Sequence, residues 1–188
     1  MTGEASQLTT PFDLPWPRAT ARTVLRPLTM GDVDAMLVYR SLPEVCRYLN
    51  HDVLDRVAVE ERISSRMPEN QSGGDITCGL AVVMDGQMVG DAMLRVITRA
   101  REAWIGFGLH PSVWGRGLAS EIASELVRLG SSLGMSVWAD VFEENIPSQK
   151  ALMRAGLAAQ GAHEGRKLFT NADPTTADRA DTGAEESQ

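Results

Sequence analysis

The sequence has few aromatic residues, only two cysteines and no long apolar run. Aromatic side chains make up 5% of the 188 residues, but 43% are hydrophobic, so one domain can still bury a sizeable core. Cys46 and Cys78 show neither a metal-ligand spacing nor a disulfide framework, which favours two small buried side chains over a redox pair. Because no stretch approaches about 18 consecutive apolar residues, the sequence predicts no membrane span. It also predicts no metal site.

Positive charge is scarce as well. The net charge of −7 argues against a general nucleic-acid-binding protein. The N-terminus lacks the basic start and apolar stretch of a secretory signal peptide, so a cytoplasmic protein is expected. We expect a flexible N-terminus at 1–20, one folded domain at 21–170 and a disordered acidic tail at 171–188, which holds five acidic residues and one arginine.

The apolar pattern predicts one α+β domain. Two stretches, 76–84 and 87–97, flank Asp85-Gly86, a pair that suits a type I′ hairpin turn. A helix is predicted from about Gly117 to Leu133, because apolar residues recur there on one helical face. The other predicted elements are strands at 24–28, 103–109, 136–142, 157–163 and 166–170, and helices at 30–42, 44–49, 57–67 and 145–155.

The stretch His110–Glu121, HPSVWGRGLASE, places two glycines and an arginine against the start of the predicted long helix. Helix N-termini carry unpaired N–H groups and a partial positive charge, and glycine lets the backbone approach a ligand. With Arg116 between the glycines, the loop suits a bound phosphate. Its spacing is neither a Walker loop nor GxGxxG, and no parallel βαβ unit with a ribose-binding acid is evident. Taken alone, the loop is also compatible with an ordinary tight turn.

The stretches IGFGLHPSVWGRGLASE, VWADVFEEN and NIPSQKALMRAGL, in this order, resemble the GNAT superfamily of acyl-CoA-dependent N-acetyltransferases. They look most like the branch that acetylates N-terminal amines of ribosomal proteins, and like related small-molecule acetyltransferases. WGRGLASEIA at Trp114–Ala123 is similar to a family signature such as WGKGYATEA, and Asn145, Ser148 and Gly156 follow at the family's spacing. The resemblance covers about residues 22–165.

The resemblance implies a GNAT-like fold, a mixed and mostly antiparallel sheet flanked by helices, with a central splay between the strands at 104–109 and 136–142. It implies acetyl-CoA as co-substrate, with its pantetheine arm between the splayed strands and its pyrophosphate on the loop amides. The cofactor-binding residues that it implies are Leu109, Trp114, Gly115, Arg116, Gly117, Leu118, Ala119, Ser120, Asn145 and Ser148.

The resemblance also implies a site for amine attack on the thioester. The N–H of Leu109 would stabilise the developing oxyanion. Ser148, at the position of a family serine, would give a proton to the departing sulfur, and Leu152 stands where many superfamily members have a tyrosine donor. Asn145 would contact the cofactor, cap the last helix, or do both.

The general base is the residue that the sequence determines least. Many relatives carry a glutamate two residues before the strand glycine, and Trp104 stands there in this chain. Glu102 lies on the same strand face two residues earlier and is our candidate base, with a solvated strand-end residue as the alternative. Asp140 could serve instead, unless it is buried with a partner. His110 fits better as a residue that shapes the loop before Pro111.

The predicted function is direct transfer of an acetyl group from acetyl-CoA to a primary amine, either a protein N-terminus or a small cationic amine such as an aminoglycoside. The alternative is a non-catalytic acyl-CoA-binding regulatory module of the same fold, which the tryptophan at position 104 favours. A cationic acceptor is expected because acids gather in the presumed acceptor region, although such acids could equally solvate helix faces. These acids are Glu44, Asp52, Asp55, Glu60 and Glu61. A homodimer is left open.

Overall fold

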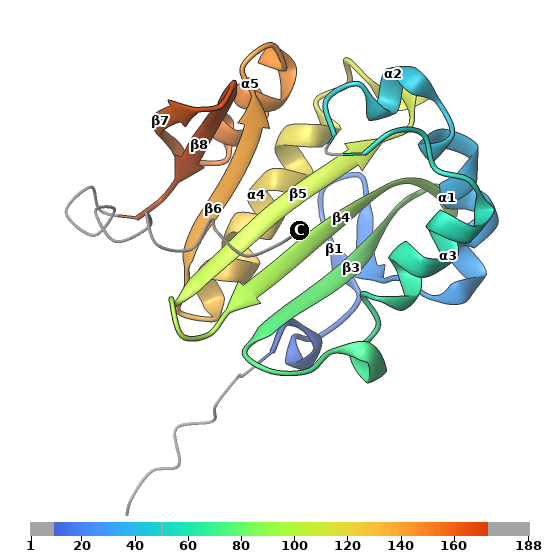
Figure 1. The fold of residues 1–188 in the computed structure, drawn as a ribbon, viewed down its shortest axis with the longest axis horizontal. Coiled ribbons are helices and arrows are strands. Elements are labelled where there is room, and N and C mark those ends of the chain that lie inside the picture. Colours follow the sequence, from blue (N-terminus) through green and yellow to red (C-terminus); the bar gives the residue numbers. More distant parts are fainter. Residues whose placement is uncertain (1–9, 50, 173–188) are drawn as a thin grey trace, which may run out of the picture.

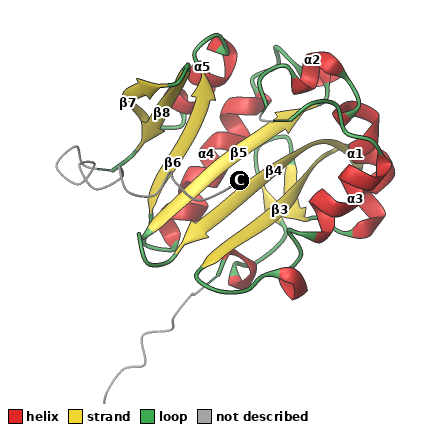
Figure 2. Ribbon diagram, in the orientation of Figure 1, coloured by secondary structure: helices red, strands yellow, loops and turns green. Residues whose placement is uncertain are grey.

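Eight strands form one sheet, and helices pack on both of its faces (Figures 1 and 2). The computed structural model describes residues 10–49 and 51–172. The strand order is β1-β2-β3-β4-β5-β6-β8-β7, and every neighbouring pair except β5–β6 is antiparallel. The strands are β1 (Arg18–Ala19), β2 (Val24–Pro27), β3 (Asp75–Met84), β4 (Gln87–Ile97), β5 (Glu102–Leu109), β6 (Ser136–Phe142), β7 (Ala158–His163) and β8 (Arg166–Thr170).

The helices fall into two groups along the chain. Three helices lie between β2 and β3, namely α1 (Val33–Arg40), α2 (Pro43–Cys46) and α3 (Arg56–Ser64). The other two are α4 (Leu118–Ser132), which connects β5 to β6, and α5 (Ile146–Arg154), which follows β6. Within the described part of the chain, none of these helices is both long and apolar enough to cross a bilayer.

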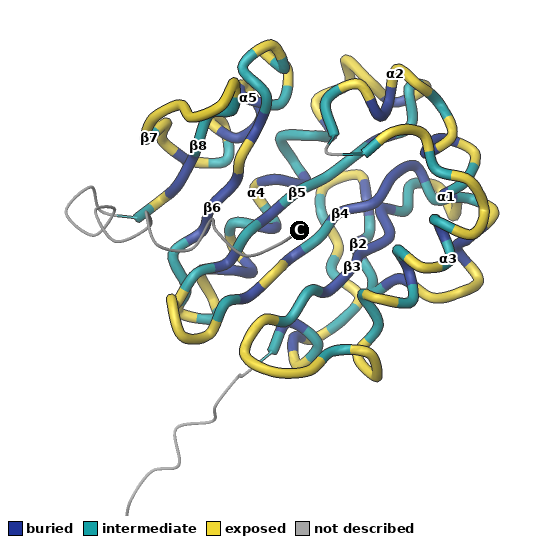
Figure 3. Tube along the Cα trace, in the orientation of Figure 1, coloured by how far each residue is buried: buried dark blue, intermediate teal, exposed yellow. Residues whose placement is uncertain are grey.

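Each face of the sheet buries its own apolar cluster (Figure 3). Ala92 and Leu94 of β4 belong to the cluster that contains the buried face of α4, whereas Ala81 of β3 packs with Met36 of α1 and Ile63 of α3. Because successive side chains of a strand point to opposite faces, β3 and β4 contribute residues to both clusters. The α4 side and the α1–α3 side of the sheet are therefore separate environments.

Local sequence signals account for most element ends. Asp85 and Gly86 have φ values of 51° and 76°, which confirms the type I′ turn between β3 and β4. The predicted helix at 117–133 is observed as α4, with Leu118, Ile122, Leu126 and Leu129 buried.

The central pair of strands is parallel and only partly joined. β5 and β6 pair at Glu102↔Ser136, Ala103↔Val137 and Trp104↔Trp138, and beyond these three positions the strands diverge, as Figure 1 shows. The expected splay is confirmed. The β5–α4–β6 crossover is the parallel part of the mixed sheet that the resemblance implied. Three paired residues leave no signature in a sequence, because the identity of a strand's neighbour is not a local property.

Residues 10–20, which were expected to be flexible, are part of the fold. Leu14 is buried in the α4-side cluster, and Phe12 and Trp16 pack against that cluster. The Trp16 indole donates a hydrogen bond of 3.0 Å to the Pro11 carbonyl. This segment has no helical or strand periodicity from which its packing could be recognised. The remaining residues of the expected flexible ends, 1–9 and 173–188, lie outside the described residues.

Candidate functional site

The glycine loop, Trp114–Gly117, joins the end of β5 to α4. Gly115 and Gly117 have φ values of +72° and +79°, a conformation that strongly favours glycine. Gly117 is the N-cap of α4, and no side chain caps this end of the helix. The N–H groups of the first helical turn are therefore available to an external acceptor. A Cβ added at Gly115 would meet no atom within 4 Å, so the loop is also open to a ligand.

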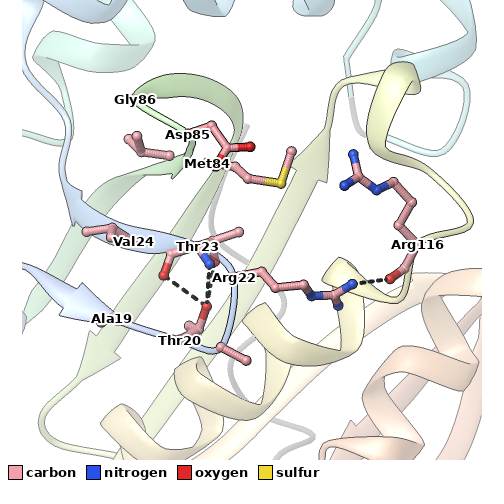
Figure 4. A pocket seen from close by; sticks show the side chains of 11 residues that line it. Ala19, Thr20, Arg22, Thr23, Val24, Met84, Asp85, Gly86 and Arg116 are labelled. Atoms are coloured by element: carbon pink, nitrogen blue, oxygen red, sulfur yellow. Dashed lines mark hydrogen bonds between the residues drawn. The ribbon is translucent and has the colours of Figure 1, made fainter.

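A contact from the N-terminal segment supports the loop, and the sequence analysis did not identify it. Arg22 donates from Nη1 to the Arg116 carbonyl at 2.7 Å (Figure 4). Its Nε donates to Glu121 at 2.9 Å. The Arg22 N–H also donates to Glu121, at 2.7 Å, and Thr20 makes a short hydrogen bond to the same carboxylate. A shallow hollow of about 530 Å³ lies beside this contact, lined by the Ala19–Val24 segment, the Val83–Gly86 turn and Arg116.

Glu121, in the first turn of α4, is fixed as an anion by these contacts. Burial acts to raise its pKa, but the hydrogen bonds from Thr20 and Arg22 prevail, and the pKa lies below its usual value. The carboxylate therefore serves as an anchor for the segment before β2, and its charge is already paired. The glycine-rich pattern predicted the loop but gave no signal for this anchor, because Arg22 and Glu121 are 99 residues apart.

The last residues of β5 present backbone groups to the splay. His110 donates its N–H to the Val89 carbonyl of β4 at 2.8 Å, and Leu109 is the residue before His110. Because backbone groups alternate in an antiparallel pair, the N–H groups of Leu109 and Phe107 face away from β4 and toward β6. The pairing of β5 with β6 has ended by this point. The Trp114 indole donates to the Leu109 carbonyl at 2.8 Å and so ties the glycine loop to the strand end.

Asn145 and Ser148 lie where β6 passes into α5. The side-chain oxygen of Asn145 accepts the Ser148 N–H at 3.3 Å, so Asn145 is the N-cap of α5, as the sequence predicted. This use of the oxygen leaves the amide NH₂ group of Asn145 to other partners. Ser148 is partly exposed, and within the described residues its hydroxyl has no hydrogen-bond partner. Both residues therefore keep a polar group available for a ligand.

Glu102 lies at the closed end of the splay. It is the first residue of β5, opposite Ser136, and its carboxylate accepts the indole N–H of Trp104 at 2.9 Å. The Trp104 ring stacks on Trp138 with a centroid separation of 5.9 Å. Seven residues separate Glu102 from Leu109, which is about 23 Å along a strand. The structure therefore brings Asn145, Ser148, Leu109 and the glycine loop to the open end of the splay, and Glu102 to the other end.

The two weaker base candidates are engaged in structural contacts. His110 accepts the Ser112 N–H at 3.1 Å and contacts the Ser112 hydroxyl at 2.8 Å, so it caps the turn that begins at Pro111. Asp140 is exposed on β6 and receives a hydrogen bond from Arg166 of β8. The contacts of His110 agree with the loop-shaping role expected for it, whereas Asp140 has a partner but is not buried as its alternative required.

A buried polar cluster on the α1–α3 side was missed by sequence reasoning. Asp91 of β4 is 1% exposed and accepts hydrogen bonds from Tyr39 and Arg40 of α1. Arg62 of α3 and Arg66 lie around the same carboxylate. Two arginines on a helical pattern are usually solvent-facing, so only the tertiary structure could reveal that these charges meet inside.

A family model for the acetyltransferase (GNAT) domain matches residues 22–158. The chain belongs to this family. One relative is an uncharacterized N-acetyltransferase of Bacillus subtilis (strain 168), YoaA, which is 29% identical over 163 residues that cover 82% of this chain and 89% of YoaA. The family membership confirms the resemblance drawn from the glycine loop and the two segments that follow it.

Solved structures of GNAT proteins share the fold. The ribosomal L7/L12 alpha-N-protein acetyltransferase RimL, solved with coenzyme A, has a TM-score of 0.69 at 15% identity, with 84% of this chain and 97% of RimL covered. The acetyltransferase AAC(6′)-Ib, solved with acetyl-CoA, has a TM-score of 0.67 at 15% identity, with 87% of this chain and 99% of that chain covered. At these identities the likeness confirms the predicted sheet with its flanking helices.

Proposed function

We propose that this protein is an acetyl-CoA-dependent N-acetyltransferase that transfers the acetyl group directly to a primary amine. The candidate acceptors are a protein N-terminus and a small amine. The small amines include the cationic ones expected from the sequence. The observation that carries the proposal is the convergence of an uncapped, glycine-started helix with the open end of a strand splay. Both RimL and AAC(6′)-Ib, whose folds this chain shares, were solved with coenzyme A or acetyl-CoA.

The glycine loop would bind the pyrophosphate of acetyl-CoA. Its residues and the first turn of α4, from Gly115 to Ser120, supply backbone N–H groups, and the positive end of the helix favours the anion. Trp114 would hold the loop against the strand end, and Arg116 would add a charged contact. The free amide group of Asn145 and the Ser148 hydroxyl would contact the cofactor from the other side of the splay.

Bound acetyl-CoA supplies the thioester whose acetyl group is transferred. The N–H of Leu109 would stabilise the negative charge that develops on the carbonyl oxygen as the amine nitrogen bonds to the carbonyl carbon. When the carbon–sulfur bond breaks, the Ser148 hydroxyl would donate a proton to sulfur and regain one from water. The proton lost by the amine would pass to ordered water, and Glu102, at the closed end of the splay, would accept it only through that water and so contribute a small part of the rate.

A non-catalytic acyl-CoA-binding module is the second candidate. The observation that favours it is the stacked Trp104–Trp138 pair, which stands on the strand face where many relatives have their base. In this case the chain would keep the phosphate-binding loop and lack a competent general base.

The deciding experiment measures release of free thiol from acetyl-CoA with a panel of primary amines, together with calorimetric titration of acetyl-CoA. We expect micromolar binding, amine-dependent thiol release and an acetylated amine detected by mass spectrometry. Binding without thiol release for every amine tested would support the binding module. The absence of binding would reject both functions.

A further inference from the structure

Three arginine side chains surround one carboxylate on the α1–α3 side of the sheet. Arg40 of α1 donates from Nε to Asp91 Oδ1 at 2.8 Å, and Tyr39 donates its hydroxyl to the same oxygen at 2.8 Å. Arg62 of α3 has its Nη2 3.8 Å from Asp91 Oδ2, beyond hydrogen-bonding distance. The side chain of Arg66, just after α3, makes no hydrogen bond or ion pair with any described residue. We call Arg40, Arg62 and Arg66 the arginine cluster.

Positive charge exceeds negative charge in this cluster. Asp91 is the carboxylate with the largest effect on Arg62 and Arg66. Three guanidinium nitrogens are shut off from solvent without a partner in the described structure: Nη1 of Arg40, Nε of Arg62 and Nη1 of Arg66. Burial, followed by repulsion from Arg62, lowers the pKa of Arg66 to about 10. Buried cations without a counter-charge destabilise a fold, so such a set suits an anion that binds from outside.

The cluster lies beside the proposed reaction centre. Arg40 packs so closely on Gly108 of β5 that an added Cβ there would be 2.6 Å from Nη2 and 3.2 Å from Nη1. Gly108 is the residue before Leu109, whose N–H is the proposed oxyanion donor. Asp91 and Ala92 are neighbours on β4, and Ala92 belongs to the α4-side cluster, so Asp91 and the arginines lie on the opposite face. An acceptor would therefore meet the arginines as it approaches from the face opposite α4.

The cluster can be reached from solvent. The Arg62 side chain is 20% exposed. A hollow of about 670 Å³ is lined in part by Cys46, Arg47, His51 and Asp52, and none of the three cluster arginines lines it. The Cys46 thiol donates to the Arg40 carbonyl at 3.3 Å, and Nε2 of His51 is buried without a partner among the described residues. The exposed part of the Arg62 side chain is therefore where an anion from solvent would first contact the cluster.

We propose that the arginine cluster binds an oxyanion on the acceptor, so that the substrate is a small amine with a carboxylate or phosphate group a few bonds from its nitrogen. This inference rests on the proposed N-acetyltransferase function and names its substrate class. Guanidinium groups are well suited to it, because their planar donor sets match the oxygens of carboxylate and phosphate. Arg40 contacts Gly108, the residue before Leu109. The amine and the oxyanion of the substrate must therefore lie close together.

Most of the acids that suggested a cationic acceptor lie away from the arginine cluster, although Asp52 lines the hollow described above. Glu44, Asp52, Asp55 and Glu61 are exposed. Asp55 caps α3 through the Ala58 N–H at 2.9 Å. Exposed charges are screened by water and salt, whereas charges in a desolvated site interact strongly. The inner arginines should therefore select the acceptor, and the outer acids should at most affect the rate of encounter.

Binding of an anion can be tested without catalysis. We would titrate succinate and inorganic phosphate into the protein by calorimetry, with coenzyme A at saturation to occupy the glycine loop. Wild type should show saturable binding of at least one of them, and Arg62→Gln should weaken it at least tenfold. The matched control is Arg56→Gln, on the same helix but exposed and paired with Asp34 and Glu60, which should change affinity less than twofold. Absence of saturable binding, or equal binding by Arg62→Gln, overturns the proposal.

Turnover gives the second test. 2-Aminoethyl phosphate and aspartate should be acetylated with lower KM than ethanolamine and spermidine, and the first two distinguish phosphate from carboxylate as the preferred group. Arg62→Gln should raise KM for the better anionic amine at least tenfold, whereas the control Arg56→Gln should change it less than twofold. Preference for spermidine or ethanolamine would overturn the inference and leave the acetyltransferase function intact. Arg62-dependent succinate or phosphate binding without thiol release from any amine would leave the anion site and reject the acetyltransferase.

Discussion

The two faces of the sheet carry different kinds of polar group. On the α4 side, the proposed cofactor contacts come mainly from backbone N–H groups of the glycine loop and from the splayed strand β5. On the α1–α3 side, the polar groups are side chains, and Tyr39, Arg40, Arg62 and Asp91 are brought together from separate elements. Backbone contacts depend on local conformation, whereas the side-chain cluster depends on how distant elements pack. The first can be retained while the second changes, which allows one fold to serve different acceptors.

The largest effect should follow from removing the carboxylate of the buried cluster. Asp91→Asn leaves three arginines without their counter-charge, and loss of one partner of a buried ion pair destabilises a protein by about 3–5 kcal/mol. Urea unfolding at pH 7 measures this difference. The exposed pair Asp75–Arg95, at 2.9 Å, supplies the control, because Asp75→Asn should change the free energy of unfolding by less than about 1 kcal/mol. Equal effects of the two substitutions would contradict the importance given to Asp91.

The same variant should reveal a pH dependence. Burial acts to raise the pKa of Asp91. Arg40, Arg62 and Arg66 lower that pKa by a larger amount, so it lies below the usual value of 3.8. A lowered pKa means that the stabilisation is complete above the usual value and is lost as pH falls through the lowered one. The stability difference between wild type and Asp91→Asn should therefore be constant near neutrality and shrink below pH 3.8. A difference that does not shrink in acid would show that the carboxylate charge is not its cause.

The next effect concerns the glycine loop on the α4 side of the sheet. Gly117→Glu should reduce acetyl-CoA affinity at least about a hundredfold, or roughly 2.8 kcal/mol, because an anion would occupy the phosphate position. The residue also has φ +79°, which strains any L side chain. Gly73→Glu is a fair control, since Gly73 has φ +81° with no atom within 4 Å of an added Cβ and lies outside the loop. Calorimetric affinity that is equal in the two variants would place the pyrophosphate elsewhere.

A smaller effect is expected at the sulfur end of the site. Ser148→Ala should lower kcat about tenfold, or roughly 1.4 kcal/mol, while acetyl-CoA affinity changes less than about threefold. The reason is that proton donation to the leaving sulfur acts in the transition state. Ser132→Ala removes a helical hydroxyl that bonds only the Leu129 carbonyl and should leave kcat unchanged. An unaltered kcat for Ser148→Ala would remove Ser148 from the mechanism.

The smallest effect is expected at Glu102. Glu102→Gln keeps the hydrogen bond to the Trp104 indole through the amide oxygen, so the fold should be preserved. Because Glu102 lies at the closed end of the splay, we expect kcat to fall less than about fivefold, or about 1 kcal/mol. A pH–rate profile should keep its shape. A loss of a hundredfold or more, with the basic limb of the profile shifted, would instead make Glu102 the principal base.

The glycine loop and the elements around it could be predicted because their sequence signals are local. Two glycines before a periodic apolar face indicated the loop and α4, Asp85-Gly86 indicated the hairpin, and Asn145 indicated the start of α5. Each prediction used residues within one turn or one helix of each other, where backbone sterics and capping decide the conformation. The splay itself was expected through the family resemblance.

Local sequence patterns and the family resemblance were enough to predict the α+β class, the glycine loop, the family and most of the element order, although not β1. Tertiary structure decided which strand lies beside β5, that Leu14 and Trp16 join the core, and that Arg22 supports the loop from 94 residues away. It also decided that Arg40 and Arg62 meet Asp91 inside the molecule. The physical reason is that local conformation follows from sterics and hydrogen bonds of neighbouring residues, whereas the environment of a charge depends on which distant surfaces enclose it.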